Sequence, residues 1–178
     1  RSVGPGNTAA LAVGTSNALT ISGSTATFAS ALPSRVGVGD ALQYDDDDDG
    51  DIDASDSIVF IHSRVNSTTY TVKTASGGVP TAVATDNDWS LFRAYTSLSL
   101  AEAGTENVGI DADLVDFDTL GKDLTSTNEV WNIFCYGDAA DTTAVTIDGW
   151  TTDADNYIRV YTPVSKREVG ISQRHRGK

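Results

Sequence analysis

Apolar and polar residues alternate along much of the chain, and this period of two is typical of β-strands. The alternation is clear from Ala18 to Leu32, where Gly23 marks a turn between two short strands. Other stretches carry the same pattern. We expect further strands in DALQY (40–44), SIVFIHSRV (57–65), TTYTVKTA (68–75) and WSLFRAY (89–95).

The last third of the chain contains short β-like runs at regular spacing. Three short β-like runs, VWNIFCYG (130–137), TAVTIDGW (143–150) and NYIRVYTPV (156–164), are separated by polar segments rich in turn residues. Regular spacing of this kind predicts a sandwich, a barrel or the coils of a β-solenoid. Residues 76–88 carry Gly-Gly and Pro, which favours a loop there.

One segment favours a helix. Between Ser99 and Asn107, Ser99 and Glu102 have the spacing of a capping box, and the residues between them are good helix formers. Residues 108–128 are acidic and irregular, so we expect a long surface connection. The chain is therefore predicted to be mostly β, with a β-sandwich, jelly-roll-like or short β-solenoid architecture and one short helix. We expect one β-rich domain over 1–178, with a subdivision into a sandwich-like part (1–107), a connection (108–128) and solenoid-like strands (129–178).

The charge balance narrows the choice of partners. The 178 residues carry a formal net charge of −13, which repels nucleic acid and anionic lipid and attracts cations. No apolar run approaches the ~18 residues that a membrane span needs. Cys135 is the only cysteine, which excludes an internal disulfide, and its apolar surroundings favour a buried, unreactive thiol. Few lysines and many Asp, Thr, Ser and Gly residues are typical of secreted bacterial β-proteins, and Arg at position 1 indicates a cleaved chain or a fragment.

The most informative stretch is YDDDDDGDIDASDS (44–57), which holds eight aspartates. If Gly50 is position 6 of a twelve-residue calcium loop, aspartates fall at the ligand positions and Ile52 falls where an apolar residue anchors the loop. Gly at position 6 permits the sharp turn, and alternate side chains then point inward to an ion that takes six to eight oxygens. The predicted ligands are Asp45, Asp47, Asp49, Asp51 (through its backbone carbonyl), Asp53 and Asp56.

This stretch resembles the calcium loops of EF-hands and dockerins, and Asp in place of Glu at position 12 is as in dockerins. Its flanks differ, since ALQY and SIVFIHSR indicate strands where those families have helices. We therefore expect a Ca²⁺ loop set into a β-hairpin. The alternative is a mobile acidic tip, but eight carboxylates without a cation would repel one another strongly.

Other groups of residues have simpler interpretations. The acids of 111–123 lack the glycine register, and those of 138–155 lie at turns, where turn chemistry explains them. His62 and His175 lie in no metal or triad motif. The C-terminal segment is basic, either as a solvated tail or as an end that docks on an acidic patch of a neighbouring subunit. Its basic residues are Lys166, Arg167, Arg174, Arg176 and Lys178.

The C-terminal third resembles the start of the right-handed parallel β-helix (pectin-lyase-like) domain of large secreted bacterial proteins. The resemblance is carried by the segments TAVTIDGWTT, YIRVYTPV and SQRHRGK. The segment from ATFASALP to WSLFRAYTSL is similar to the part that precedes that domain. The resemblance implies a fold and an extracellular location more than an activity. The catalytic residues of the family lie on later coils and correspond to no position here, which argues against an enzyme. A solenoid with so few coils would also leave an open sheet edge for another chain.

Three functions fit these observations. The first is a secreted, calcium-binding structural protein that assembles with itself into an extracellular filament, tube or surface layer. The second is a carbohydrate-binding or carbohydrate-active fragment, with an extracellular polysaccharide as its partner and Trp89, Trp150 or Tyr157 as contact residues. The third is a structural subunit of a virus particle. We favour the first, with no nucleic acid and no membrane span.

Overall fold

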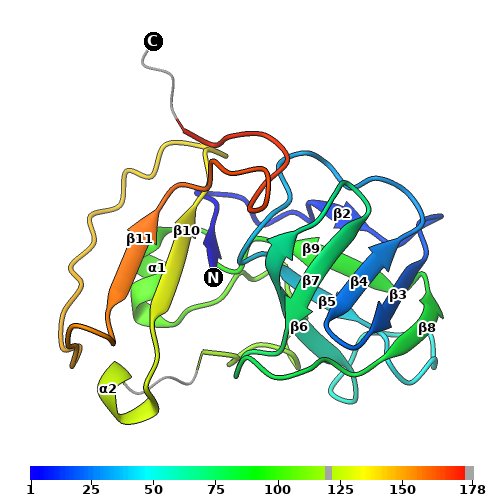
Figure 1. Cartoon of the computed structure of the whole chain (residues 1–178), viewed down its shortest axis with the longest axis horizontal. Coiled ribbons are helices and arrows are strands. Elements are labelled where there is room, and N and C mark those ends of the chain that lie inside the picture. Colours follow the sequence, from blue (N-terminus) through cyan, green and yellow to red (C-terminus); the bar gives the residue numbers. More distant parts are fainter. Residues whose placement is uncertain (119–121, 175–178) are drawn as a thin grey trace.

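The computed structural model describes residues 1–118 and 122–174. It is mostly β, as predicted, with one large and one small sheet and two short helices (Figure 1). The strands are β1 (Ser2–Val3), β2 (Ala12–Val13), β3 (Leu19–Ser22), β4 (Thr25–Phe28), β5 (Ala41–Tyr44), β6 (Ser57–Arg64), β7 (Thr69–Lys73), β8 (Val83–Asp86), β9 (Trp89–Phe92), β10 (Trp131–Cys135) and β11 (Ile158–Tyr161). The helices are α1 (Leu98–Ala103) and α2 (Leu124–Thr127).

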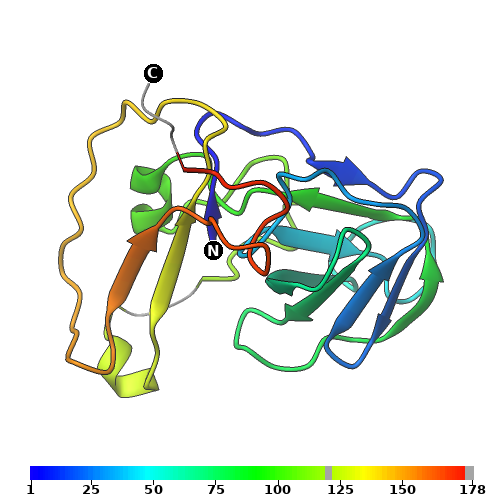
Figure 2. The same ribbon diagram turned by 45° about the horizontal axis from the view of Figure 1, so that its top comes forward.

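The large sheet has eight antiparallel strands in the order β2-β9-β5-β6-β7-β4-β3-β8 and curls into an open half-barrel (Figures 1 and 2). Alternate residues of its strands point inward and form the first core, in which Phe28 packs edge-on against Tyr70 and Trp89. The predicted hairpin of β3 and β4 is confirmed, since Ser22 pairs with Thr25 and Gly23 has a φ of 56°.

The small sheet has three parallel strands in the order β1-β10-β11. A second core fills the space between it and the outer face of the large sheet, and includes Phe60, Phe92, Trp131 and Ile133. Because β1 comes from the chain start and pairs with β10, the first and last thirds of the chain share this sheet. The subdivision at 107 and 128 stays a prediction.

A buried ionic network connects the two sheets. Arg93, directly after β9, is fully buried and donates two hydrogen bonds from Nη1 to Asp40, at 2.7 and 2.9 Å. Its Nε donates to Asp138, beyond β10, at 2.8 Å, and its guanidinium lies 3.4 Å from the ring centroid of Tyr136. Burial opposes the charged guanidinium, but Asp40 and Asp138 outweigh it and raise the pKa of Arg93.

Two strand expectations are wrong. Residues 83–86, expected in a loop, form β8 and pair with β3. Residues 143–150, expected as a strand, form none, and most of their side chains are exposed. Alternation alone does not make a strand, because a strand also needs a neighbour for its backbone groups.

The helix expectations also need correction. The described residues form two short helices, where one was expected. Helix α1 is capped by Ser97, whose Oγ accepts a hydrogen bond from the Leu100 amide at 3.0 Å, so Ser99 and Glu102 form no capping box. The predicted surface connection of 108–128 contains α2, and its Ile110, Leu114 and Leu124 are buried in the second core.

No helix in the described ranges is long and apolar enough to cross a membrane.

Candidate metal centre

The acidic loop, residues 45–56, connects two antiparallel strands of the large sheet. β5 ends at Tyr44, β6 begins at Ser57, and these two residues are paired in register. The prediction that strands and not helices flank this loop is therefore confirmed. Both strands lie in the middle of the sheet and β5 is buried along its length, so the ends of the loop are fixed by the fold.

The internal turn of the loop also follows the prediction. Gly50 has a φ of 91°, in the left-handed region that glycine adopts without steric cost. Asp48, with a φ of 64°, occupies that region as well, which Asp tolerates better than most residues. Ile52 is half-buried and packs against the second core, as expected of the apolar anchor.

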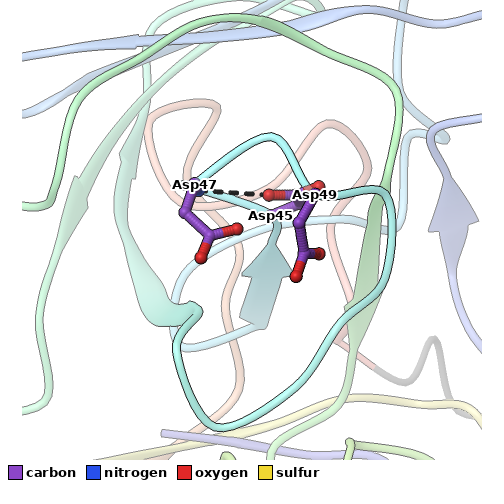
Figure 3. Close-up of side chains that lie close together, drawn as sticks. All are labelled: Asp45, Asp47 and Asp49. Atoms are coloured by element: carbon purple, nitrogen blue, oxygen red, sulfur yellow. Dashed lines mark hydrogen bonds between the residues drawn. The ribbon is translucent and has the colours of Figure 1, made fainter.

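Asp45 organises the first half of the loop. The residue is only 2% exposed, and its carboxylate accepts hydrogen bonds from three amides of the loop. Oδ1 accepts from Asp47 at 3.1 Å (Figure 3) and from Asp48 at 2.6 Å, and Oδ2 accepts from Gly50 at 2.8 Å. An ionised carboxylate has about four lone-pair sites, so these bonds leave room for a cation.

Asp47 and Asp49 bring two more carboxylates to this point. One oxygen from each of Asp45, Asp47 and Asp49 lies within 4.8 Å of the others. Figure 3 shows the carboxylates of Asp47 and Asp49 on the same side of the loop, where both residues are exposed to solvent. Three converging oxygens are a partial coordination shell for Ca²⁺, and solvent can supply further ligands.

The remaining predicted ligands lie outside this cluster. The Asp56 carboxylate accepts hydrogen bonds from the amides of Asp46 (3.0 Å) and Asp53 (2.8 Å), so it ties the two halves of the loop together. Burial, together with the charges of Asp45 and Asp47, raises its pKa. Asp53 accepts from Ser55, and these hydrogen bonds lower the pKa of Asp53. Asp51 is exposed, and its expected contribution was its backbone carbonyl.

Two acids of the centre were missed from the sequence. Asp86 ends β8 and Asp88 directly precedes β9, and each brings a carboxylate oxygen within 4.8 Å of one another and of Asp45. The Asp45 amide donates to the Asp88 carbonyl at 3.0 Å, continuing the pairing of Tyr44 with Trp89. The sequence feature that could have indicated them is the segment DND (86–88), with its two aspartates. Its position next to Asp45 depends on the pairing of β9 with β5, a contact between distant segments.

The other predicted acids take structural roles. Asp123 caps α2, Asp138 pairs with Arg93, and Asp141 accepts a hydrogen bond from the Leu98 amide. Asp118 lies 2.7 Å from the Arg1 guanidinium. Within 1–118 and 122–174, the only groups of three or more acids that could hold an ion are the two that contain Asp45.

The candidate carbohydrate contacts are only partly accessible. Trp89 is buried in the first core, where its Nε1 donates to the Asn17 carbonyl at 2.8 Å. Trp150 is half-buried and stacks on Trp131, with ring centroids 4.6 Å apart, and Tyr157 is 43% exposed.

Within the described ranges, no histidine joins a group of possible metal ligands. His62 is exposed on β6. Near the C-terminal end, Lys166, Arg167 and Arg174 are exposed as well. His175, Arg176 and Lys178 lie outside the described residues. Cys135 is half-buried on β10, where burial raises the pKa of its thiol, in keeping with an unreactive cysteine.

Comparison of the chain with protein-family models, with curated proteins and with solved structures finds no match. The resemblance to β-helix proteins therefore stays a prediction, and the cluster of carboxylates around Asp45 is the feature that points to a function.

Proposed function

We propose that the protein is a secreted, calcium-binding structural subunit that assembles with other copies of itself outside the cell. The observation that carries the proposal is the convergence of the Asp45, Asp47 and Asp49 carboxylates on a loop whose ends are fixed in the large sheet. No Lys or Arg forms a salt bridge with these acids in the described part of the chain, so a cation is the natural counter-charge.

The ion would stabilise the folded state. A ligand that binds only the folded chain adds about 2.7 kcal/mol when its concentration is a hundred times its Kd. Extracellular modules bind Ca²⁺ with a Kd of ~10⁻⁴–10⁻³ M, so about 1 mM calcium outside a cell occupies roughly half or more of such a site. Bound calcium would thus keep the loop in one conformation where the protein works.

The outer edge of β11 supports assembly. β11 pairs with β10 on one side, and no other described strand pairs with its second side. The connection from β10 runs along the outside of β11 (Figures 1 and 2), but makes no backbone hydrogen bond to that strand among the described residues. Val160 on β11 and Val164 just beyond it are 40% and 41% exposed. An open edge with exposed apolar side chains favours the addition of a strand from another copy.

The experiment is sedimentation velocity, with negative-stain microscopy, on the purified chain in about 2 mM calcium and in excess EGTA. The proposal predicts large, regular assemblies in calcium that dissociate in EGTA. Monomers in both buffers would refute the assembly, and calcium binding by those monomers would leave a metal-stabilised monomeric domain.

A further inference from the structure

The carboxylates that lie close to Asp45 come from the loop and also from the turn between β8 and β9. Asp45, Asp86 and Asp88 form a second group of carboxylates within 4.8 Å of one another, and this group shares only Asp45 with the loop group. Its members come from two segments that are distant in the sequence and are held together by the pairing of β5 with β9.

Asp86 has an unsatisfied oxygen. The residue is 7% exposed, and its Oδ1 accepts a hydrogen bond from the Asp88 amide at 2.7 Å. Its Oδ2 is buried and has no hydrogen-bond partner among the described residues. Buried carboxylate oxygens are normally paired, because an unpaired buried charge is costly.

The fold holds this turn in place. A Cβ atom on Gly14 would lie 1.8 Å from the carbonyl oxygen of Asn87, so the backbone directly after β2 packs against the backbone of the turn between Asp86 and Asp88. Movement of the turn away from Asp45 would break the hydrogen bond from the Asp45 amide to the Asp88 carbonyl. The unfavourable arrangement is therefore built into the sheet.

We propose that Asp45, Asp86 and Asp88 hold a second divalent cation, next to the ion of the loop. Asp45 serves both ions: the three amide bonds leave its carboxylate about one free lone-pair site, so it ligates one ion directly and the other through water. The proposal rests on the proposed function only in that the two ions share Asp45. A single divalent cation neutralises two of the five carboxylates in the two groups, whereas two cations neutralise four. The buried Oδ2 of Asp86 then gains the partner that the protein does not provide. Ca²⁺ fits, because it accepts irregular shells of carboxylate and backbone oxygens and waters.

The test is equilibrium dialysis of the full chain against calcium, with the bound metal counted by mass spectrometry. We expect about two ions for the wild type and about one for each of two variants, Asp86→Asn/Asp88→Asn and Asp47→Asn/Asp49→Asn. The control is Asp113→Asn/Asp155→Asn, which makes the same change in charge at exposed acids and keeps both ions. Thermal unfolding in EGTA verifies that each variant is folded.

A single substitution, Asp88→Asn, tests the second site without changing Asp86, whose buried side chain could affect folding when it is replaced. Asp88 is exposed, so Asp88→Asn leaves the core intact, and it should weaken the second ion by about tenfold or more, since even partners outside the coordination shell contribute this much. One ion bound equally by the wild type and the Asp86→Asn/Asp88→Asn variant would overturn the second site and leave the loop site standing. If the wild type binds one ion and the Asp47→Asn/Asp49→Asn variant binds that ion with the same affinity, the loop site would instead be overturned.

Discussion

Removing the Arg93 side chain should destabilise the protein more than removing any exposed charge. Its guanidinium is fully buried and bonds to two carboxylates, one from each side of the boundary between the two sheets. Arg93→Ala leaves Asp40, which is also fully buried, without a counter-charge. Breaking a buried ion pair in this way costs about 3–5 kcal/mol. For a chain of this size, that corresponds to a fall in Tm of about 6–20 °C.

Urea denaturation of Arg93→Ala and of Lys122→Ala provides the comparison. Lys122 pairs with Glu102 at the surface, where its side chain is 43% exposed, and removing an exposed pair costs about 1 kcal/mol or less. The urea midpoint of Arg93→Ala should fall by about 1 M or more, given a slope of about 1–3 kcal/mol per M. Adding Asp40→Ala to Arg93→Ala should recover part of the lost stability, because it removes the unpaired buried charge. Equal, small losses in Arg93→Ala and Lys122→Ala would show that the network does not hold the sheets together.

Three further predictions concern pH, the loop turn and the sheet edge. Burial alone would raise the pKa of Asp138, but Arg93 outweighs it and holds that pKa below its ordinary value. The stabilisation of the fold by ionised Asp138 is therefore full above pH ~4, the pKa of the unfolded chain, and is lost as the pH falls through the folded pKa. Asp138→Asn should lower the free energy of unfolding in urea by about 1.5–3 kcal/mol at pH 7 and by much less at pH 2–3, and an equal loss at both pH values would contradict this. Gly50→Ala should cost about 1–2 kcal/mol in thermal unfolding, from the positive φ alone, since no atom lies within 4 Å of the added Cβ; no loss would mean that the turn adopts another conformation. Val160→Lys should abolish assembly in calcium while calcium affinity is unchanged, and persistent polymers in sedimentation velocity would exclude the β11 edge as the interface.

Local patterns predicted the parts of the fold that local chemistry determines. The hairpin of β3 and β4 follows from alternation and from Gly23, and the loop of 45–56 follows from Gly50 and the two flanking strands. In both, residues adjacent in the chain are also adjacent in the sheet. The glycine positions then set the turns.

The parts that depend on distant contacts were not predictable. Residues 143–150 alternate but have no neighbouring strand, whereas β8 follows a Gly- and Pro-rich segment and still finds β3 as a partner. Asp86 and Asp88 lie close to Asp45 because β9, which follows them, pairs with β5. A sequence pattern gives each segment a preference, but the partner that satisfies its backbone is chosen by the whole sheet.

The most direct test of the metal centre is the thermal unfolding of the wild type and of Asp47→Asn/Asp49→Asn, each measured in EGTA and in saturating calcium. Filling the loop site at a hundredfold excess over its Kd adds about 2.7 kcal/mol, which raises the Tm of a chain of this size by about 5–10 °C. We expect the calcium-induced rise to fall to about half or less in the loop variant. The Asp113→Asn/Asp155→Asn control should respond as the wild type does. Equal rises in the wild type and the loop variant, or no rise in either, would contradict calcium binding by this loop.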